Sequence, residues 1–467
     1  MLKAFDKEIV SGSLLRSVWK LAWPLVLLNL INGMHGIVDH VLIGHFHGSA
    51  DNAANAAIGV AWQVFLVIVV FIASIFHGMN VLIARYAGRQ DRDTISEVFY
   101  AAFMVSLIIL VGIVAPLGYF CAPLLLRAVN IADEVYVHAL PYLRLLFLCG
   151  APLFLMFMLT GAFHASGEPK TPLKLGILTT ALNILISSVL IIGIGPFPPL
   201  GVMGAALGTV LAPTVSCGIG LYLVFSRRMI IQPPRRFRVL PDLQLLRGMA
   251  RIGIPTGIQG VLLNIAGVLL LRYISTLEHS AAAQAAYTIC YAQLFSLVTW
   301  TSFGLRAAAG TLMGQNIGAG VRRRGKRGVV FAACMGAAWS FAVGVVFWTY
   351  PGVLLRLFNA VDEPVFSFGV SLLRYLSLSG VAVAVNLALT GGLQGAGATR
   401  VPMFIAFATQ IVALLSICQF FLSMGTLTAD KVWAALFFSH ALRLTLTWLV
   451  FRTDGWTHTS VELESAG

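Results

Sequence analysis

Charged side chains are scarce in this sequence: they make up 10% of its 467 residues, whereas 58% of the residues are hydrophobic. A water-soluble domain of this length does not need so large an apolar fraction for its core. Cysteine pairs of the CxxC type are missing too, and the six cysteines stand singly, so neither a disulfide framework nor a zinc site is expected. The composition therefore indicates an integral membrane protein.

Signatures of ATP and metal binding are also missing. The sequence has no GxxxxGK[ST] motif, so ATP hydrolysis is not expected to drive the protein. His35, His40 and His45 are five residues apart, and each step turns the side chain by about 140° around a helix, so the three do not converge on one metal. We therefore expect a protein that is not an enzyme and has no metal site, no catalytic residues and no bound cofactor.

Long apolar runs are abundant. A run of about 20 apolar residues marks a bilayer-spanning helix, and such runs predict an all-α protein with twelve transmembrane helices. The formal net charge of +13 does not indicate nucleic-acid binding, because the basic residues lie in short loops between the runs. By the positive-inside rule, their distribution places both termini in the cytoplasm.

The chain reads as two similar halves of six spans. The segment 226–251 carries seven arginines and one acid, Asp242. We predict an N-terminal lobe over 1–225, this basic linker, and a C-terminal lobe over 252–467. "ASGEPKTP" recurs as "GAGATRVP" 230 residues later, with Gly167 matching Gly397, and "LPYLRLLFLCG" recurs as "GVSLLRYLSLSG". With an even number of spans in each half, the predicted pseudo-twofold axis lies along the membrane normal, an arrangement typical of secondary transporters.

Asp39 is the one acidic residue inside a predicted span. A carboxylate at a lipid-facing helix centre costs about 2.5 to 3.5 kcal/mol or more, so Asp39 is expected to face a polar surrounding. Asn32 and His35 precede it by seven and four residues and share its helix face. Its counterpart in the repeat is Leu270, so symmetric packing does not require the acid. A buried acid that gains and loses a proton suits ion coupling; the alternative is that Asp39 lies near the outer helix end and is simply solvated.

Arginines inside the spans are candidates for cavity residues or for structural roles. Arg306 replaces Asn80 of the other half, so it is a candidate for lining the cytoplasmic side of a cavity, with interfacial anchoring as the alternative. Arg144 and Arg374 correspond in the repeat, which favours a shared architectural role. Arg443, in the last span, is interpreted as structural.

The order of these motifs resembles the multidrug and toxic compound extrusion (MATE) transporters, and most of all their DinF-type branch. The resemblance runs from "LAWPLVLLNLINGMHGIVDHVLIGHFHG" through "GAFHASGEPKTP" and "TLMGQNIGAG" to "GGLQGAGATRVP". It implies a monomeric antiporter of the bacterial inner membrane that exports amphipathic, cationic organic compounds in exchange for protons by alternating access. A sodium-coupled version, or a flippase for lipid-linked oligosaccharides, is the alternative.

The resemblance also implies roles for residues of the N-terminal lobe. Asp39 would couple transport to the ion, and Pro24, fifteen residues before it, would let the first helix bend. Ser187 stands where many relatives have a second acid. The predicted helices 252–273 and 367–393 lack the acids of sodium-coupled relatives, which favours H⁺ over Na⁺ as the coupling ion. With His35, which shares the helix face of Asp39, the residues expected to line the N-lobe cavity are Asn32, His35, Tyr142, Asn183, Ser187 and Thr209.

Overall fold

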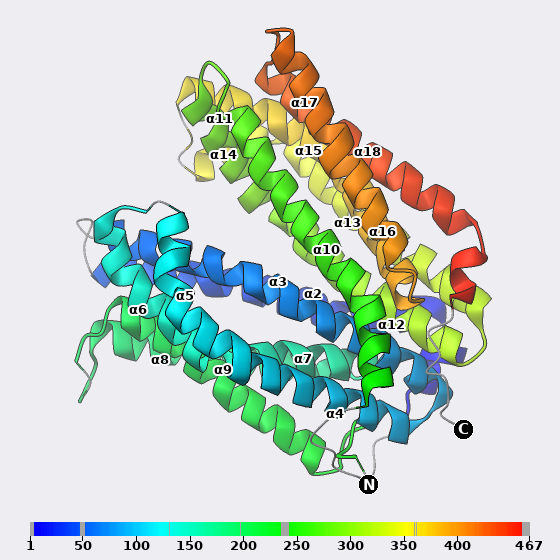
Figure 1. Ribbon diagram of the computed structural model, residues 1–467. Coiled ribbons are helices and arrows are strands. Elements are labelled where there is room, and N and C mark those ends of the chain that lie inside the picture. The colour runs from blue at the N-terminus through cyan, green and yellow to red at the C-terminus, as the bar shows by residue number, and fades with distance from the viewer. Residues whose placement is uncertain are drawn as a thin grey trace. The chain divides into compact units, whose positions relative to one another are not determined.

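The computed structural model describes residues 4–46, 52–129, 131–196, 198–234, 242–358, 360 and 362–459, with only the backbone in 32–46, 52–55, 66–67 and 70–71. Within these ranges the chain is helical and has no strand (Figure 1). The all-α expectation is therefore confirmed. The helices of the first half are α1 (Lys7–Ser11), α2 (Leu14–Phe46), α3 (Asn52–Arg89), α4 (Arg92–Ile109), α5 (Ala115–Ala128), α6 (Asp133–Cys149), α7 (Ala151–Ala165), α8 (Lys170–Ile192) and α9 (Val202–Phe225).

The second half repeats the pattern of long apolar helices. Its α-helices are α10 (Leu243–Ile274), α11 (Ser280–Tyr287), α12 (Ser296–Gly318), α13 (Arg322–Thr349), α14 (Pro351–Leu357), α15 (Glu363–Gly395), α16 (Arg400–Ala406), α17 (Leu414–Ser423) and α18 (Ala429–Arg452), followed by the 3₁₀ turn η4 (Gly455–His458). Three π-helical segments interrupt longer helices: η1 (Leu110–Val114), η2 (Thr288–Leu294) and η3 (Phe407–Ala413). Such segments often mark functional positions, because the widened turn re-aims side chains.

Among the described residues, nine helical stretches are long and apolar enough to cross a membrane, or ten if α6 and α7 form one span bent by 54°. The two helices predicted by range, 252–273 and 367–393, lie within α10 and α15. The count of twelve stays a prediction, because side chains in parts of α2 and α3 lie outside the described residues.

The helices group into two compact units that exchange the beginnings of two helices. Unit 1 comprises Leu27–Gly253 and residues 4–6, and unit 2 comprises Lys7–Val26 and residues 254–459. The first part of α2, up to Val26, thus belongs to the unit formed by the second half of the chain. Conversely, α10 up to Gly253 belongs to unit 1. The predicted domain boundaries at 225 and 252 stay a prediction, since compact units group residues by contact rather than by chain order.

Matching positions of the two halves have matching local structure. Gly167 and Gly397 both follow a helix end with positive φ, 93° and 89°. In each case the next amide, of Glu168 or Ala398, donates to a carbonyl five residues earlier, at 2.8 and 2.9 Å. This is the glycine-dependent Schellman ending, which a side chain would strain. The guanidinium groups of Arg144 and Arg374 likewise lie over aromatic rings, of Tyr119 and Trp348.

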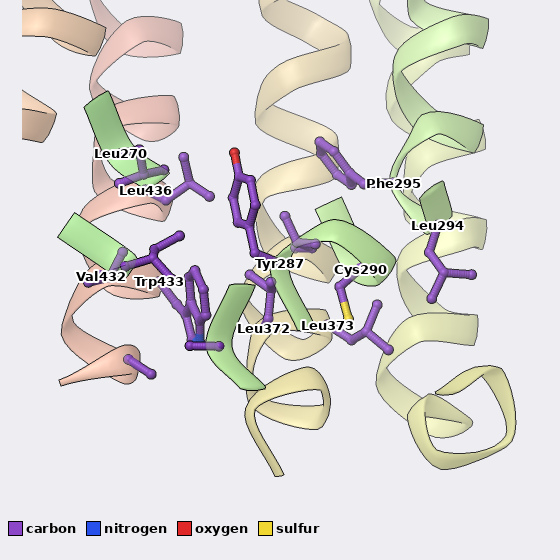
Figure 2. Packing of buried hydrophobic residues seen from close by; sticks show 14 of the residues in the cluster. Leu270, Tyr287, Cys290, Leu294, Phe295, Leu372, Leu373, Val432, Trp433 and Leu436 are labelled. Atoms are coloured by element: carbon purple, nitrogen blue, oxygen red, sulfur yellow. The ribbon is translucent and has the colours of Figure 1, made fainter. Parts of the chain in front are cut away.

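Unit 2 has an apolar core between α10, α11, α15 and α18 (Figure 2). Tyr287 stacks on Tyr291 and on Trp433, with ring centroids 5.0 and 6.1 Å apart. Leu270 is 1% exposed in the same cluster. The position that corresponds to Asp39 in the repeat is therefore ordinary packing in unit 2.

Glycines bring α12 and α15 into backbone contact. A Cβ atom on Gly391 would lie 2.1 Å from the carbonyl oxygen of Arg306, and one on Gly395 would lie 2.2 Å from that of Gly310. Only glycine permits this approach. The contact sets Arg306 of α12 beside the end of α15, where Gln394 lies.

Candidate functional site

Helix α8 carries two buried polar side chains in unit 1. Asn183 and Ser187, one helical turn apart, are both 0% exposed. Neither the amide nitrogen and oxygen of Asn183 nor the hydroxyl of Ser187 has a hydrogen-bond partner among the described residues. A buried polar group left without a partner costs about 1 to 3 kcal/mol. Such groups persist where water, an ion or a ligand binds, so this part of α8 is a candidate binding site.

Helix α9 lies close against this part of α8. A Cβ atom on Gly208 would be 2.1 Å from the Oγ atom of Ser187. The next residue, Thr209, is 6% exposed, and its hydroxyl donates to the carbonyl of Ala205 at 3.0 Å. Tyr142 of α6 is 2% exposed, and α6 packs against α9. Four predicted cavity residues, Tyr142, Asn183, Ser187 and Thr209, are therefore buried in unit 1, on α9 and on the two helices α6 and α8 that pack against it.

The remaining residues predicted for this lobe lie on α2. The side chains of Asn32, His35 and Asp39 fall outside the described residues, although their backbone is part of α2 in unit 1. Whether they face Asn183 stays a prediction. Pro24 lies inside α2, which continues through it, two residues before the point where the helix passes from unit 2 to unit 1. The role of Pro24 as a bending point stays a prediction.

Arg306 is held by two glutamines in unit 2. Its Nε and Nη2 atoms donate to the Oε1 atom of Gln394 at 3.1 and 2.7 Å. Gln394 in turn donates through Nε2 to the Oε1 atom of Gln259, at 2.9 Å. Both glutamines are nearly fully buried. They were not predicted from the sequence, where the only signal was that uncharged amides stand within otherwise apolar runs.

A second basic group, which is buried, comes from α18. Arg443 is 8% exposed, and no described residue gives it a hydrogen bond or an ion pair. It is close enough to Arg306 for the two charges to repel each other, and it is also within electrostatic reach of Tyr291 and His440. The sequence did not connect Arg443 with Arg306, which is partly buried; a structural role for Arg443 stays a prediction.

The described residues contain no group of three or more His, Cys, Asp or Glu side chains that could hold a metal ion. The polar groups gathered in the two units are instead amides, hydroxyls and guanidinium groups. These bind organic molecules and anions through hydrogen bonds rather than coordinate a transition metal.

An all-helical membrane protein of two units with buried polar groups inside its long helices is the architecture of a membrane transporter. The family model MatE matches residues 24–189 and 255–418, one match in each half. The chain belongs to this family, the MATE transporters, and is therefore a multi-pass membrane transporter and not an enzyme. The double match confirms the internal repeat. The assignment to the DinF-type branch stays a prediction.

Known relatives extend over most of the chain. It is 26% identical over 443 residues to "Probable multidrug resistance protein NorM" of Thermotoga maritima, covering 95% of this chain and 93% of the relative. It is 23% identical to a protein named "FAD transporter" of Shewanella oneidensis, covering 78% of each. A solved MOP superfamily transporter from Pyrococcus furiosus matches with a TM-score of 0.87 at 19% identity, over 96% of this chain and 98% of that one. At this identity the solved structure shows the fold alone.

Proposed function

We propose that the protein exports amphipathic, cationic organic compounds, including drugs, in exchange for protons by alternating access. It would act as a monomer in a bacterial inner membrane, with both termini in the cytoplasm. Relatives named as multidrug resistance proteins support the substrate class. The basic loops support the orientation.

One observation carries the proposal: in the interior of unit 1, the amide of Asn183 and the hydroxyl of Ser187 have no partner in the part of the chain that the structure describes. In an apolar helix bundle such groups are retained for function, because unpartnered polar atoms destabilise the fold. They can donate to and accept from an organic molecule, whereas the surrounding apolar residues pack against its body. Tyr142 and Thr209 add polar atoms on neighbouring helices.

Asp39 is the basis for proton coupling. It is the one acid in a predicted span, and the corresponding Leu270 is buried among apolar side chains. At about 150 mV, moving one proton across the membrane supplies about 3.5 kcal/mol, enough for a substrate gradient of a few hundredfold. Na⁺ is less suited, because a dehydrated hard cation needs several oxygen ligands and usually a charge, and the middle parts of α10 and α15 contain no acid.

Proton and substrate would exclude each other. A cation binds best when Asp39 is ionised, and protonation of Asp39 removes that attraction. By thermodynamic linkage, the bound substrate disfavours protonation to the same degree. Release of substrate on one side and of the proton on the other then completes the exchange, with Pro24 as the proposed bending point of α2.

The test uses purified protein in liposomes with an imposed pH gradient and a cationic dye as substrate. Dye movement and dissipation of the gradient are expected to depend on each other, and Asp39→Asn is expected to abolish both. The matched control is Asp133→Asn, at the start of α6, which should transport like the wild type. Coupled transport that persists in Asp39→Asn refutes the role of this residue. Dye movement driven equally well by a sodium gradient alone refutes the proton assignment and leaves the sodium-coupled alternative.

A lipid-linked oligosaccharide flippase is the other alternative. In the same liposomes, transfer of a fluorescent polyprenyl-diphosphate saccharide between leaflets, without any dye transport, would favour it over export of amphipathic compounds.

A further inference from the structure

We propose that unit 2 contains a binding site for the carboxylate or phosphate group of an amphipathic organic anion, formed by Arg306 and Arg443 with Gln259 and Gln394. This inference goes beyond the proposed function. It concerns a different unit and a ligand of opposite charge, and it holds or fails independently of the coupling ion.

The first argument is the position of the two guanidinium groups. Arg306 lies in the middle of α12 and Arg443 in the middle of α18, and both helices pack against α15. Their charges repel each other. Two basic groups inside a helix bundle, Arg443 buried and Arg306 partly buried, favour the binding of an anion that offsets their charge.

The second argument is that no described carboxylate in unit 2 can supply that anion. Within residues 254–459 every acid lies at a helix end or in a connecting segment: Glu278, Asp362, Glu363, Asp430 and Asp454. Two of them are engaged elsewhere, since Asp430 accepts a hydrogen bond from Ser371, and Asp454 accepts one from Lys326. Glu8 of α1 pairs with Arg16 and Lys20. Among the described residues of unit 2, therefore, no carboxylate neutralises Arg306 or Arg443, which leaves the two groups available to a bound anion.

The third argument is that the guanidinium groups of Arg306 and Arg443 keep N–H donors without described partners, and that the plane of one of the groups is fixed. Gln394 accepts from Nε and Nη2 of Arg306, which fixes the plane of the guanidinium group and leaves Nη1 without a described partner. Gln259 holds Gln394 in that orientation. Arg443 uses none of its five N–H donors on a described residue. A planar fork of this kind matches carboxylate and phosphate oxygens.

The fourth argument concerns the apolar part of the ligand. Tyr291, within electrostatic reach of Arg443, lies in the π-helical segment η2 and stacks between Tyr287 and Phe295, at 5.0 and 5.5 Å. Figure 2 shows Tyr287, Trp433 and Phe295 around the same core. Aromatic faces next to a pair of guanidinium groups suit a ring-bearing anion.

The test measures binding to the purified protein in nanodiscs of zwitterionic lipid, so that no anionic headgroup competes. The probes share one apolar body: 2-naphthoate, 2-naphthyl phosphate, neutral 2-naphthamide and cationic 2-naphthylmethylammonium. Isothermal titration is expected to show that one or both anions bind at least about tenfold more tightly than the amide, the difference that a charge-assisted hydrogen bond to arginine produces. Inorganic phosphate is expected to compete.

The variants Arg443→Gln and Arg306→Gln are each expected to remove this preference for the anion, while the amide binds as before. The matched control is Arg374→Gln, the same substitution at an exposed arginine of α15 whose guanidinium lies over Trp348. Equal binding of anion and amide to the wild type, or an unchanged anion preference in Arg443→Gln, overturns the proposal.

If the glutamine variants do not fold, Arg443→Lys keeps the charge and loses the planar fork. Weakened binding of the naphthyl anions with unchanged binding of naphthamide then supports the site, and unchanged binding of the anions refutes it. Failure of the proton experiment with Asp39→Asn would leave these outcomes untouched, because the binding measurement involves neither a gradient nor a cationic dye.

Discussion

The amide of Asn183 is buried and has no hydrogen-bond partner among the described residues. Replacing it with leucine, a side chain of similar size, removes the cost of burying the amide, which is about 1 to 3 kcal/mol. We expect Asn183→Leu to raise the melting temperature, or leave it unchanged, and to abolish binding of the exported compound. Thermal unfolding in detergent and dye binding measure the two effects on the same sample.

The control for this prediction is Asn264→Leu on α10. Asn264 is exposed, and its amide donates to the carbonyl of Gly260 at 3.0 Å. This variant should bind dye like the wild type. If Asn183→Leu lowers the melting temperature and still binds the dye, Asn183 has a structural role.

Single residues differed in how far the sequence could identify them. Asp39 could be identified because a charged residue within an apolar run is evident from the sequence itself. Asn183 could be identified because it lies in a motif that resembles the family. Gln259 and Gln394 could not be paired, since they are 135 residues apart and only the fold brings them to 2.9 Å. The interpretation of Arg443 as structural stays a prediction, because whether an acid lies next to it depends on the fold and cannot be seen in the sequence.

At the scale of elements, the packing of α12 on α15 depends on glycine. A Cβ atom on Gly391 would lie 2.1 Å from the backbone oxygen of Arg306, so the helices would have to separate. We expect Gly391→Ala to destabilise the protein by about 1 to 3 kcal/mol, the usual cost of overpacking. Because separation moves Arg306 away from Gln394, the same variant should weaken binding of naphthoate. Chemical unfolding and titration test the two parts.

Gly267→Ala is the matched control in the same unit. Nothing lies within 4 Å of the added Cβ atom, and alanine favours a helix over glycine by about 0.5 to 1 kcal/mol. This variant should be as stable as the wild type or more stable. A Gly391→Ala protein with the stability of Gly267→Ala would show that the helices adjust without cost.

The helices were predictable because run length and helix endings are local signals. The glycines of "ASGEP" and "GAGAT" marked two equivalent helix ends, and both have the positive φ that such an ending needs. The bend of 54° between α6 and α7 was not predicted, because the apolar pattern continues across residue 150. The π-helical segments η2 and η3 also leave no pattern, since one extra residue in a turn does not interrupt an apolar run.

At the scale of the molecule, the exchange of helix beginnings ties the two halves of the chain together. Unit 1 is complete only with α10 up to Gly253, and unit 2 only with α2 up to Val26. We expect fragments 1–238 and 239–467 to be unstable when each is produced alone, because each unit then lacks a packed helix segment. Produced together, they should reassemble into a transport-active complex. Size-exclusion chromatography and dye transport provide the readouts.

A fragment that is monodisperse and thermally stable on its own would contradict this prediction. Fragments 1–26 and 27–467, produced together, provide a comparison. Because this cut leaves the helix segment up to Val26 free to dock on unit 2, the pair is expected to reassemble as well. The exchange of helix beginnings could not be predicted from the sequence. The basic linker at 226–251 indicates where the halves join, but it does not indicate which helix packs in which unit.

The exchanged helix beginnings also bear on the ancestry of the chain. If a half-length gene was duplicated and fused, its product already needed a segment from a second copy to complete each bundle. The ancestor was then an intertwined homodimer rather than a self-sufficient monomer, and fusion made an existing partnership permanent. Once both copies shared one gene, each was free to diverge, and an acid could persist at position 39 while its twin became a leucine.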